Sequence, residues 1–256
     1  MYSIYMDIAE LMYIIGTLLI LPAILFAFIA QGKVSSAFNR YSQVASASGI
    51  TGAQLARRLL DQNGCSHVTV EQSKHGHLSD HYDPRKRAVR LSHDVFNSTS
   101  LAALGVAAHE VGHAIQHQQK YLPLMIRQIV IKSTSLINKA LMPLIIIGLL
   151  ASIFVTGTTI MGMASEDFWF VLIILFCAIY MISFLINLIT LPTEYNASAR
   201  AKKLLREGNY LFDAEEYQAV SNVLGAAALT YLAGLIVSLA YLLRFLGLLL
   251  TIARRR

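Results

Sequence analysis

Long apolar stretches dominate the pattern of hydrophobic and polar positions along this chain. Four of them reach the roughly 20 residues that a helix needs to cross a hydrocarbon core. They run from Leu11 to Ala30, from Leu141 to Ala164, from Phe168 to Leu191 and from Val223 to Leu243. The polar remainder is too short to cover four such helices as the core of a soluble protein. The pattern predicts a mainly α membrane protein with three to four transmembrane helices.

The fourth stretch leaves two arrangements open. Arg244 interrupts the apolar pattern, and the continuation from Phe245 to Ala253 is too short to cross a second time. A single span would leave the terminal Arg254, Arg255 and Arg256 outside, against the rule that basic loops stay in the cytoplasm. A re-entrant or interfacial helix would keep them inside.

The polar segment between the first two spans has the pattern of a small α+β domain. Thr51 and Gln54 match a capping box, in which each side chain satisfies a backbone N–H group at a helix start. Short strands are expected from His67 to Glu71 and from Ala88 to Leu91, separated by the polar turn region 73–87. The segment from Ala88 to Leu91 is a candidate edge strand that could pair with an extended substrate.

A long helix is expected to follow, from about Thr99 to Gln119. Its candidate caps are Asn97, Ser98 and Thr99. The segment from Leu122 to Lys139 is amphipathic and basic, which is typical of an interfacial helix that leads into a span.

Composition and charge agree with this picture and orient it. Only 14% of the residues are charged and 55% are hydrophobic, whereas a soluble domain carries about 25% charged residues. The net charge of +6 comes from residues beside the apolar stretches, so we expect no nucleic-acid partner. The turn at Ser165, Glu166 and Asp167 is acidic, whereas the other loops are basic. The basic residues concerned are Lys33, Arg40, Arg127, Lys132, Lys139, Arg200, Lys202, Lys203 and Arg206.

These charges predict basic loops in the cytoplasm, an acidic turn outside and an N-terminus outside. The expected organisation is a first transmembrane helix in residues 1–30, a cytosolic domain in 31–140 and a transmembrane hairpin in 141–191. A cytosolic helix in 192–222 and the fourth transmembrane or re-entrant helix in 223–256 complete the chain. We expect an integral protein of the plasma membrane.

The candidate chemistry lies in the sequence HEVGH, at residues 109–113 of the expected long helix. Residues four apart share one face of a helix, so His109 and His113 can direct both imidazoles at one zinc ion. Glu110 is placed to act as the general base towards a water that the metal activates. The alternative is a helix with two solvated histidines.

A catalytic zinc site needs a third protein ligand. His117 lies two helical turns beyond His109, about 12 Å along the axis at 1.5 Å per residue, which is too far. Gln116 and Gln119 occupy positions where metzincins have glycine and histidine. Glu194 is the attractive candidate, because two spans separate it from His113 and return the chain to the same side of the membrane. Thr193 would cap the helix that Glu194 opens, and the alternative role for Glu194 is to complement the dipole of that helix.

The segments AAHEVGHAIQ and TEYNASARA, with HYDPRKRAVRLS upstream, resemble the YugP-type neutral zinc metallopeptidases over nearly the whole chain. These are membrane gluzincins, distantly similar to the HtpX and CAAX prenyl protease class. The resemblance implies a zincin-like domain and one zinc ion per chain, held by His109, His113 and Glu194, with Glu110 as the base. In the wider class an Asp one turn after the third ligand orients a ligand histidine. Here Ser198 takes that position.

The implied activity is a zinc-dependent endopeptidase whose site faces the cytoplasm and whose substrates are peptides or membrane proteins in the lipid bilayer. The alternative is a catalytically inactive membrane scaffold or chaperone that retains the fold. Substrate-binding residues and oligomeric state are unknown from the sequence. Candidate oxyanion donors are His81, Tyr82, Tyr195 and Arg200, and the cluster of His75, His77 and His81 could hold a second metal or be solvated.

Overall fold

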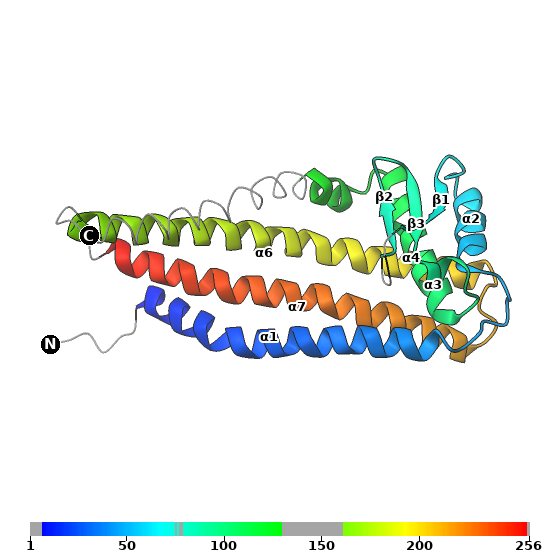
Figure 1. Ribbon diagram of the computed structural model, residues 1–256, viewed down its shortest axis with the longest axis horizontal. Helices are drawn as coiled ribbons and strands as arrows, with labels where there is room; N and C mark the ends of the chain where they lie inside the picture. Colours follow the sequence, from blue (N-terminus) through cyan, green and yellow to red (C-terminus); the bar gives the residue numbers. More distant parts are fainter. Residues whose placement is uncertain (1–6, 75, 77–78, 130–160, 255–256) are drawn as a thin grey trace. The chain divides into compact units, whose positions relative to one another are not determined.

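The computed structural model describes residues 7–74, 76, 79–129 and 161–254. In the described part of the chain three short strands follow one another, with helices before and after them (Figure 1). In chain order the elements are α1 (Ile8–Tyr41), α2 (Gly52–Gln62), β1 (Thr69–Gln72), β2 (His81–Asp83), β3 (Ala88–Leu91), α3 (His93–Phe96), α4 (Leu101–Gln118), α6 (Met161–Glu207) and α7 (Ala214–Ala253). Residues 122–129 are also helical.

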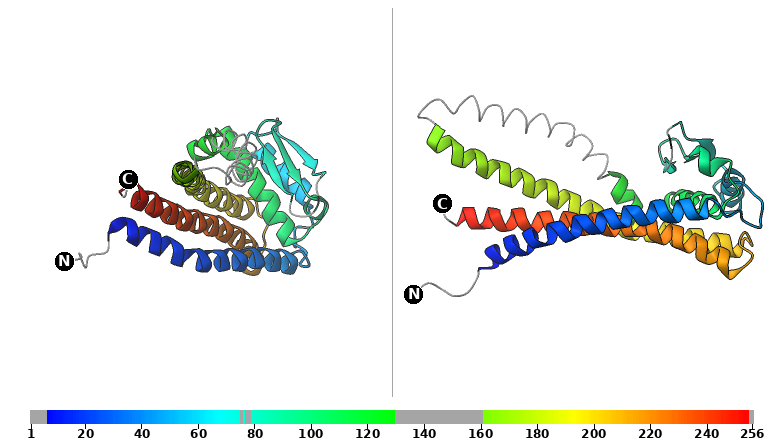
Figure 2. Two further views of the ribbon diagram at one scale, coloured as in Figure 1. Left: turned by 60° about the vertical axis from the view of Figure 1, so that its left-hand side comes forward. Right: turned by 60° about the horizontal axis from the view of Figure 1, so that its bottom comes forward.

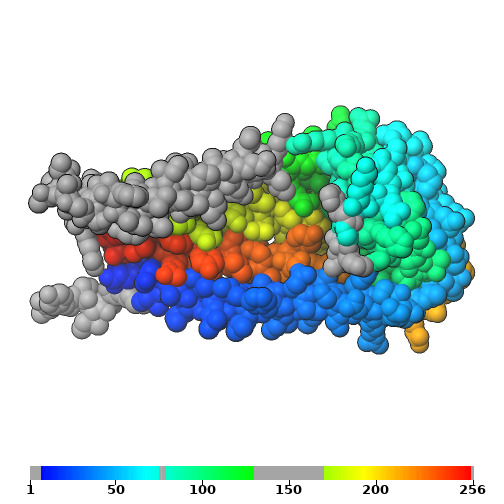
Figure 3. Space-filling model, viewed as in Figure 1, coloured from blue at the N-terminus to red at the C-terminus, as the bar shows by residue number. Residues whose placement is uncertain are grey.

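Three helices of the described part of the chain are long and apolar enough to cross a membrane. They are Ile8–Tyr41, Phe170–Glu207 and Ala214–Ala253. Leu18, Leu21 and Phe28 of α1 are 69%, 65% and 71% exposed, as expected for side chains that face lipid. In Figure 3 the side chains of α1, in blue, lie uncovered on the face that is in view. The expected class, a mainly α membrane protein with a small α+β domain, is confirmed. The predicted span from Leu141 to Ala164 lies almost wholly outside the described residues.

The helix boundaries differ from the sequence-based expectations at α6 and α7. α6 continues through Pro192 to Glu207, so no new helix begins at Glu194. Thr193 is therefore not a cap, and its hydroxyl donates to the carbonyl oxygen of Ile189 at 2.9 Å. The suggestion that Glu194 complements a helix N-terminus is wrong for the same reason. α7 runs unbroken through Arg244, so residues 245–253 extend the same helix instead of forming a separate one.

The chain forms two compact units. The described residues of the first lie within 1–26, 126–188 and 233–256, and α1 and α7 pack closely within it. A Cβ atom on Gly16 would lie 2.3 Å from the backbone nitrogen of Arg244, and one on Gly247 would lie 2.5 Å from that of Tyr13. Glycine at these two positions lets the helix backbones touch, as is common where helices associate in membranes.

The second unit comprises residues 27–125 and 189–232 and contains the sheet. The strand order is β1-β3-β2, with β1 parallel and β2 antiparallel to β3. Two further views show the sheet beside α4 (Figure 2). β3, which has the predicted bounds, is the central strand with both edges paired, so the hypothesis that it receives a substrate strand is wrong. β2 was not predicted, because it lies in the polar turn region and has no apolar alternation.

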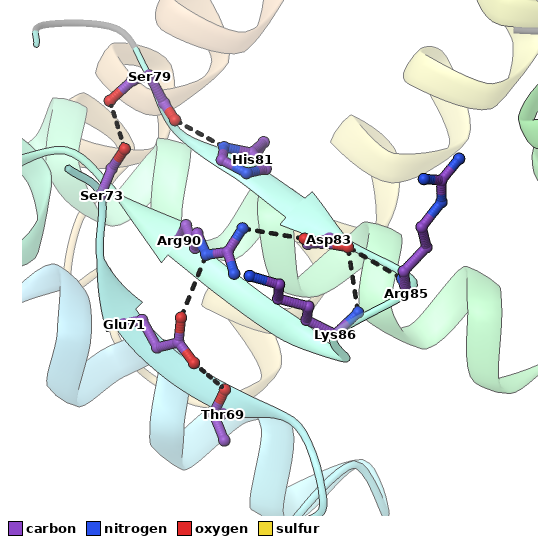
Figure 4. Close-up of polar contacts among 9 residues, drawn as sticks. All are labelled: Thr69, Glu71, Ser73, Ser79, His81, Asp83, Arg85, Lys86 and Arg90. Atoms are coloured by element: carbon purple, nitrogen blue, oxygen red, sulfur yellow. Dashed lines mark hydrogen bonds and ion pairs between the residues drawn. The ribbon is translucent and has the colours of Figure 1, made fainter. Parts of the chain in front are cut away.

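The two faces of the sheet differ in chemistry. One face joins α2 and α4 around a core that includes Leu55, Leu59, Val89 and Leu104. The other face carries a network of charged side chains (Figure 4). There Arg90 of β3 donates to Glu71 of β1 at 3.1 Å and to Asp83 of β2 at 2.9 Å, which ties the three strands together.

The helix starts were predicted with mixed success. The capping box of Thr51 and Gln54 is present at the start of α2, as predicted. The cap of α4 is Ser100, which accepts from the backbone N–H of Ala103 at 3.2 Å, and not one of the three residues that precede it. Its hydroxyl satisfies one of the N–H groups that a helix start leaves without a partner.

Candidate metal centre

The two predicted histidine ligands and the predicted glutamate lie together between α4 and α6 of the second unit. Glu194 Oε2 lies 3.1 Å from His109 Nε2 and 3.4 Å from His113 Nε2. The two imidazoles stand edge to face, with ring centroids 4.7 Å apart. One ligand atom from each of the three residues falls within 4.8 Å of the others, and this is the one such cluster found among the described residues.

The chemistry of this donor set fits zinc. Two imidazole nitrogens and one carboxylate oxygen are the ligands of many catalytic zinc sites, which keep a further position open. The side chain of Glu194 is only 3% exposed, and those of His109 and His113 are 13% and 9% exposed. A buried carboxylate needs a positive partner, which a divalent ion or a protonated imidazole can supply. Burial alone would lower the pKa of His113, but the hydrogen bond and charge of Glu194, the charge of Glu110 and the bond to Gln116 together outweigh it and raise that pKa.

Each imidazole also has a hydrogen-bond partner at Nδ1, the ring nitrogen that does not face Glu194. Ser198 Oγ lies 3.1 Å from His109 Nδ1, which is the contact that the resemblance implied for Ser198. Gln116 Oε1 lies 2.9 Å from His113 Nδ1. Sequence reasoning noted Gln116 only as a departure from the metzincin pattern. Its position three residues after His113, on the same helix face, is the signal that could have identified it.

Glu110 lies on α4 between the two histidines in sequence and is 8% exposed. A second carboxylate is near: the charge of Glu110 acts on Asp80, whose carboxylate accepts from the backbone N–H and the hydroxyl of Ser92. Burial raises the pKa of Asp80, the bonds from Ser92 oppose that rise, and the charge of Glu110 adds to it. Glu110 is thus a buried acid on the helix that carries the two histidines, and its charge acts on both Asp80 and His113.

The candidate oxyanion donors occupy different surroundings. Tyr82 bonds to His117 Nδ1 at 2.8 Å, and Arg200 donates to Asn196 and Gln119. Tyr195 follows Glu194 and is 49% exposed. The ring of His81 bonds to the carbonyl oxygen of Ser79 on the charged face of the sheet (Figure 4). The histidine cluster considered as a second metal site or as solvated includes residues 75 and 77, which lie outside the described residues.

Comparisons with known proteins agree with the geometry. A family model described as "Putative neutral zinc metallopeptidase" matches residues 16–250. The chain is 43% identical over 231 residues to the "Putative membrane protease YugP" of Bacillus subtilis (strain 168), a match that covers 89% of this chain and 93% of that protein. No solved structure matches. Because the family model covers nearly all of the chain, this protein belongs to the YugP-type family described as "Putative neutral zinc metallopeptidase".

Proposed function

We propose that this protein is a membrane-embedded, zinc-dependent endopeptidase with one zinc ion per chain. The observation that carries the proposal is the convergence of His109 Nε2, His113 Nε2 and Glu194 Oε2 from two helices that are distant in sequence. The family to which the chain belongs and the name of its relative, a membrane protease, support the same activity.

The residues take distinct roles in this proposal. His109, His113 and Glu194 would hold the ion, which supplies polarisation of a peptide carbonyl and acidification of a water molecule. Glu110 takes the proton from the attacking water and passes it to the departing amine. Ser198 orients His109 through Nδ1, so that Nε2 faces the metal.

The proposed location is the plasma membrane, with the site facing the cytoplasm. The basic residues that flank the spans support this orientation, as do the acidic residues Glu166 and Asp167, which lie near the start of α6 instead of in the predicted turn. The second unit would then be the cytosolic part, and its substrates would be peptides or membrane proteins close to the bilayer surface.

The decisive experiment compares Glu110→Gln with His113→Ala in the full-length protein in detergent. Wild type is expected to bind one zinc ion and to cleave casein or a solubilised membrane protein. Glu110→Gln is expected to keep the zinc and lose cleavage, whereas His113→Ala is expected to lose both, because a site with two remaining ligands binds zinc poorly. If wild type and Glu110→Gln hold zinc and are equally inert on every substrate tried, the inactive scaffold or chaperone becomes the better description.

A further inference from the structure

We propose that Gln116 is a positioning residue for His113, and that a chain of hydrogen bonds from Arg200 determines which nitrogen of His113 faces the metal. This inference rests on the proposed zinc site and extends it to a residue that neither the family description nor the relative's name assigns. All the residues concerned lie in the second unit, on α4 and α6.

Gln116 is fully buried and every polar atom of its side chain has a partner. Its relative exposure is 0%, and it is among the largest completely buried side chains of the described chain. Its Oε1 lies 2.9 Å from His113 Nδ1, and its Nε2 donates to the carbonyl oxygen of Thr193 and to Asn196 Oδ1, both at 2.9 Å. A buried amide is costly unless it is bonded in this way, and an apolar side chain would fill the same space without that cost.

The direction of these bonds follows from two groups that cannot change roles. Arg200 can only donate, and its Nε donates to Asn196 Oδ1 at 2.7 Å, so the oxygen of Asn196 faces the interior of the network. The carbonyl oxygen of Thr193 can only accept. Gln116 must therefore present its amide N–H groups to these two oxygens, which turns its own oxygen towards His113.

The consequence for His113 is a defined tautomer. Because the oxygen of Gln116 can only accept, His113 Nδ1 carries the proton, and in the neutral ring, the form that binds a metal, the lone pair lies on Nε2. That nitrogen is the one 3.4 Å from Glu194. Ser198 exerts a weaker control on His109, because a hydroxyl can either donate or accept. Gln116 thus fixes which ring nitrogen of His113 carries the proton, whereas Ser198 does not fix this for His109.

The same chain of bonds joins the two helices. Arg200 also donates through Nη1 to Gln119 Oε1 at 2.8 Å, so the network leaves α4 at Gln116, crosses to α6 and returns to the C-cap residue of α4, Gln119. It therefore fixes the rotation of α4 relative to the segment of α6 that carries Glu194. Orientation of the imidazole and placement of the third ligand are coupled through Gln116.

The test is the zinc affinity of full-length variants in detergent, measured by competition with a fluorescent chelator. Gln116→Met keeps the volume and removes the bonds, and should weaken zinc binding by about 10- to 100-fold, the usual effect of losing a partner of a ligand histidine. Gln118→Met is the matched control, because Gln118 lies on the same helix with an exposed side chain, and should bind as wild type does. Asn196→Asp keeps an oxygen for the Gln116 amide and the Arg200 guanidinium and should bind zinc about as tightly as wild type.

Two further readouts separate positioning from general stability. The visible spectrum of the cobalt-substituted protein should change in Gln116→Met and not in Gln118→Met, because it reports ligand geometry. Thermal unfolding of the metal-free proteins gives the purely structural effect. If Gln116→Met unfolds at a lower temperature but binds zinc as wild type does, the inference is wrong.

Asn196→Leu keeps the inference testable if Gln116→Met does not fold, because Asn196 is only partly buried and the substitution removes an oxygen that receives the Gln116 amide. Zinc affinity equal to wild type in a folded Asn196→Leu protein would show that the bonds from α6 do not direct the Gln116 oxygen to His113, and would overturn the inference. If wild type itself binds no zinc, the proposed function fails as well. If wild type binds zinc and cleaves peptides while Gln116→Met is equal to it, only the role of Gln116 is refuted.

Discussion

Gly112 of α4 and Ala197 of α6 are in direct backbone contact: a Cβ atom on Gly112 would lie 2.8 Å from the carbonyl oxygen of Ala197 and 3.3 Å from its Cα. Gly112 directly precedes His113, and Ala197 lies one turn beyond Glu194. The absence of a side chain at Gly112 therefore sets how closely the helix with the two imidazoles approaches the helix with the carboxylate.

Gly112→Ala should separate these helices and weaken zinc binding. Alanine gains up to about 1 kcal/mol in helix propensity, but overpacking of a close contact costs about 1–3 kcal/mol, so we expect a small net loss of stability. We expect a larger loss of zinc affinity, since a shift of α6 moves Glu194. Zinc competition and thermal unfolding of the metal-free protein measure the two effects.

Gly225→Ala is the matched control for this substitution. Gly225 lies inside α7 in the second unit, and a Cβ atom there meets nothing within 4 Å. The substitution should raise the unfolding temperature or leave it unchanged, with no change in zinc affinity. Equal zinc affinity in Gly112→Ala and Gly225→Ala would contradict the role given to the contact with Ala197.

Ser198 is expected to support His109 through its hydroxyl. Ser198→Ala removes the contact at 3.1 Å to His109 Nδ1 and should weaken zinc binding by about 10-fold, at the lower end of the range for such partners. Ser198→Asp places a carboxylate there, a stronger acceptor for the ring N–H, and should bind zinc at least as tightly as wild type. Chelator competition on both variants tests this, and an Ala variant with unchanged affinity would refute it.

Tyr82 and His117 form a pair whose protonation should make stability depend on pH. Burial raises the pKa of Tyr82 to about 12, so its phenol donates to Nδ1 of a neutral His117 at 2.8 Å. The pKa of His117 is lowered, first by burial and then by the charges of Arg87 and His67. The unfolded chain therefore binds this proton more readily than the folded protein does.

Through His117, the folded protein should become less stable as the pH falls. The contribution of His117 is complete above its unfolded pKa, near 6.5, and is lost as the pH falls through the lower folded value. Between pH 7.5 and pH 5.5 the unfolding temperature of the metal-free wild type should therefore change less favourably than that of His117→Gln, because the raised pKa of His113 acts in the opposite direction equally in both proteins. His93→Gln, at a side chain that is 75% exposed, should keep the wild-type slope. Identical slopes in wild type and His117→Gln would remove His117 as the cause.

Glu216 should stabilise the start of α7 and the loop after α1. Its carboxylate accepts from the backbone N–H of Ala47 at 2.7 Å and of Phe212 at 2.8 Å, and the residue is 7% exposed. Glu216→Ala should lower the free energy of unfolding by about 2 kcal/mol, a typical value for hydrogen bonds to a charged group. Glu215→Ala, at an exposed neighbour, should change it far less. Denaturant titration of both variants measures the difference.

Local sequence patterns were sufficient where the controlling interaction is itself local. The capping box of Thr51 and Gln54 and the bounds of β3 were predicted as they occur, because both depend on residues close in sequence. β2 was missed, since its place in the sheet depends on pairing with β3 and not on its own polar sequence. The continuity of α6 was also missed, because Pro192 and Thr193 look locally like a helix boundary while packing keeps the helix intact.

By itself the sequence determined the membrane class and the placement of His109 and His113 on one helix face, because apolar length and a spacing of four residues are properties of the chain alone. From the sequence, Glu194 was a candidate third ligand that could instead have complemented a helix dipole. Only the tertiary structure brought Glu194 to the imidazoles and revealed Gln116 behind His113. These contacts join α4 to a helix about 80 residues away, and no local pattern specifies the distance between two packed helices.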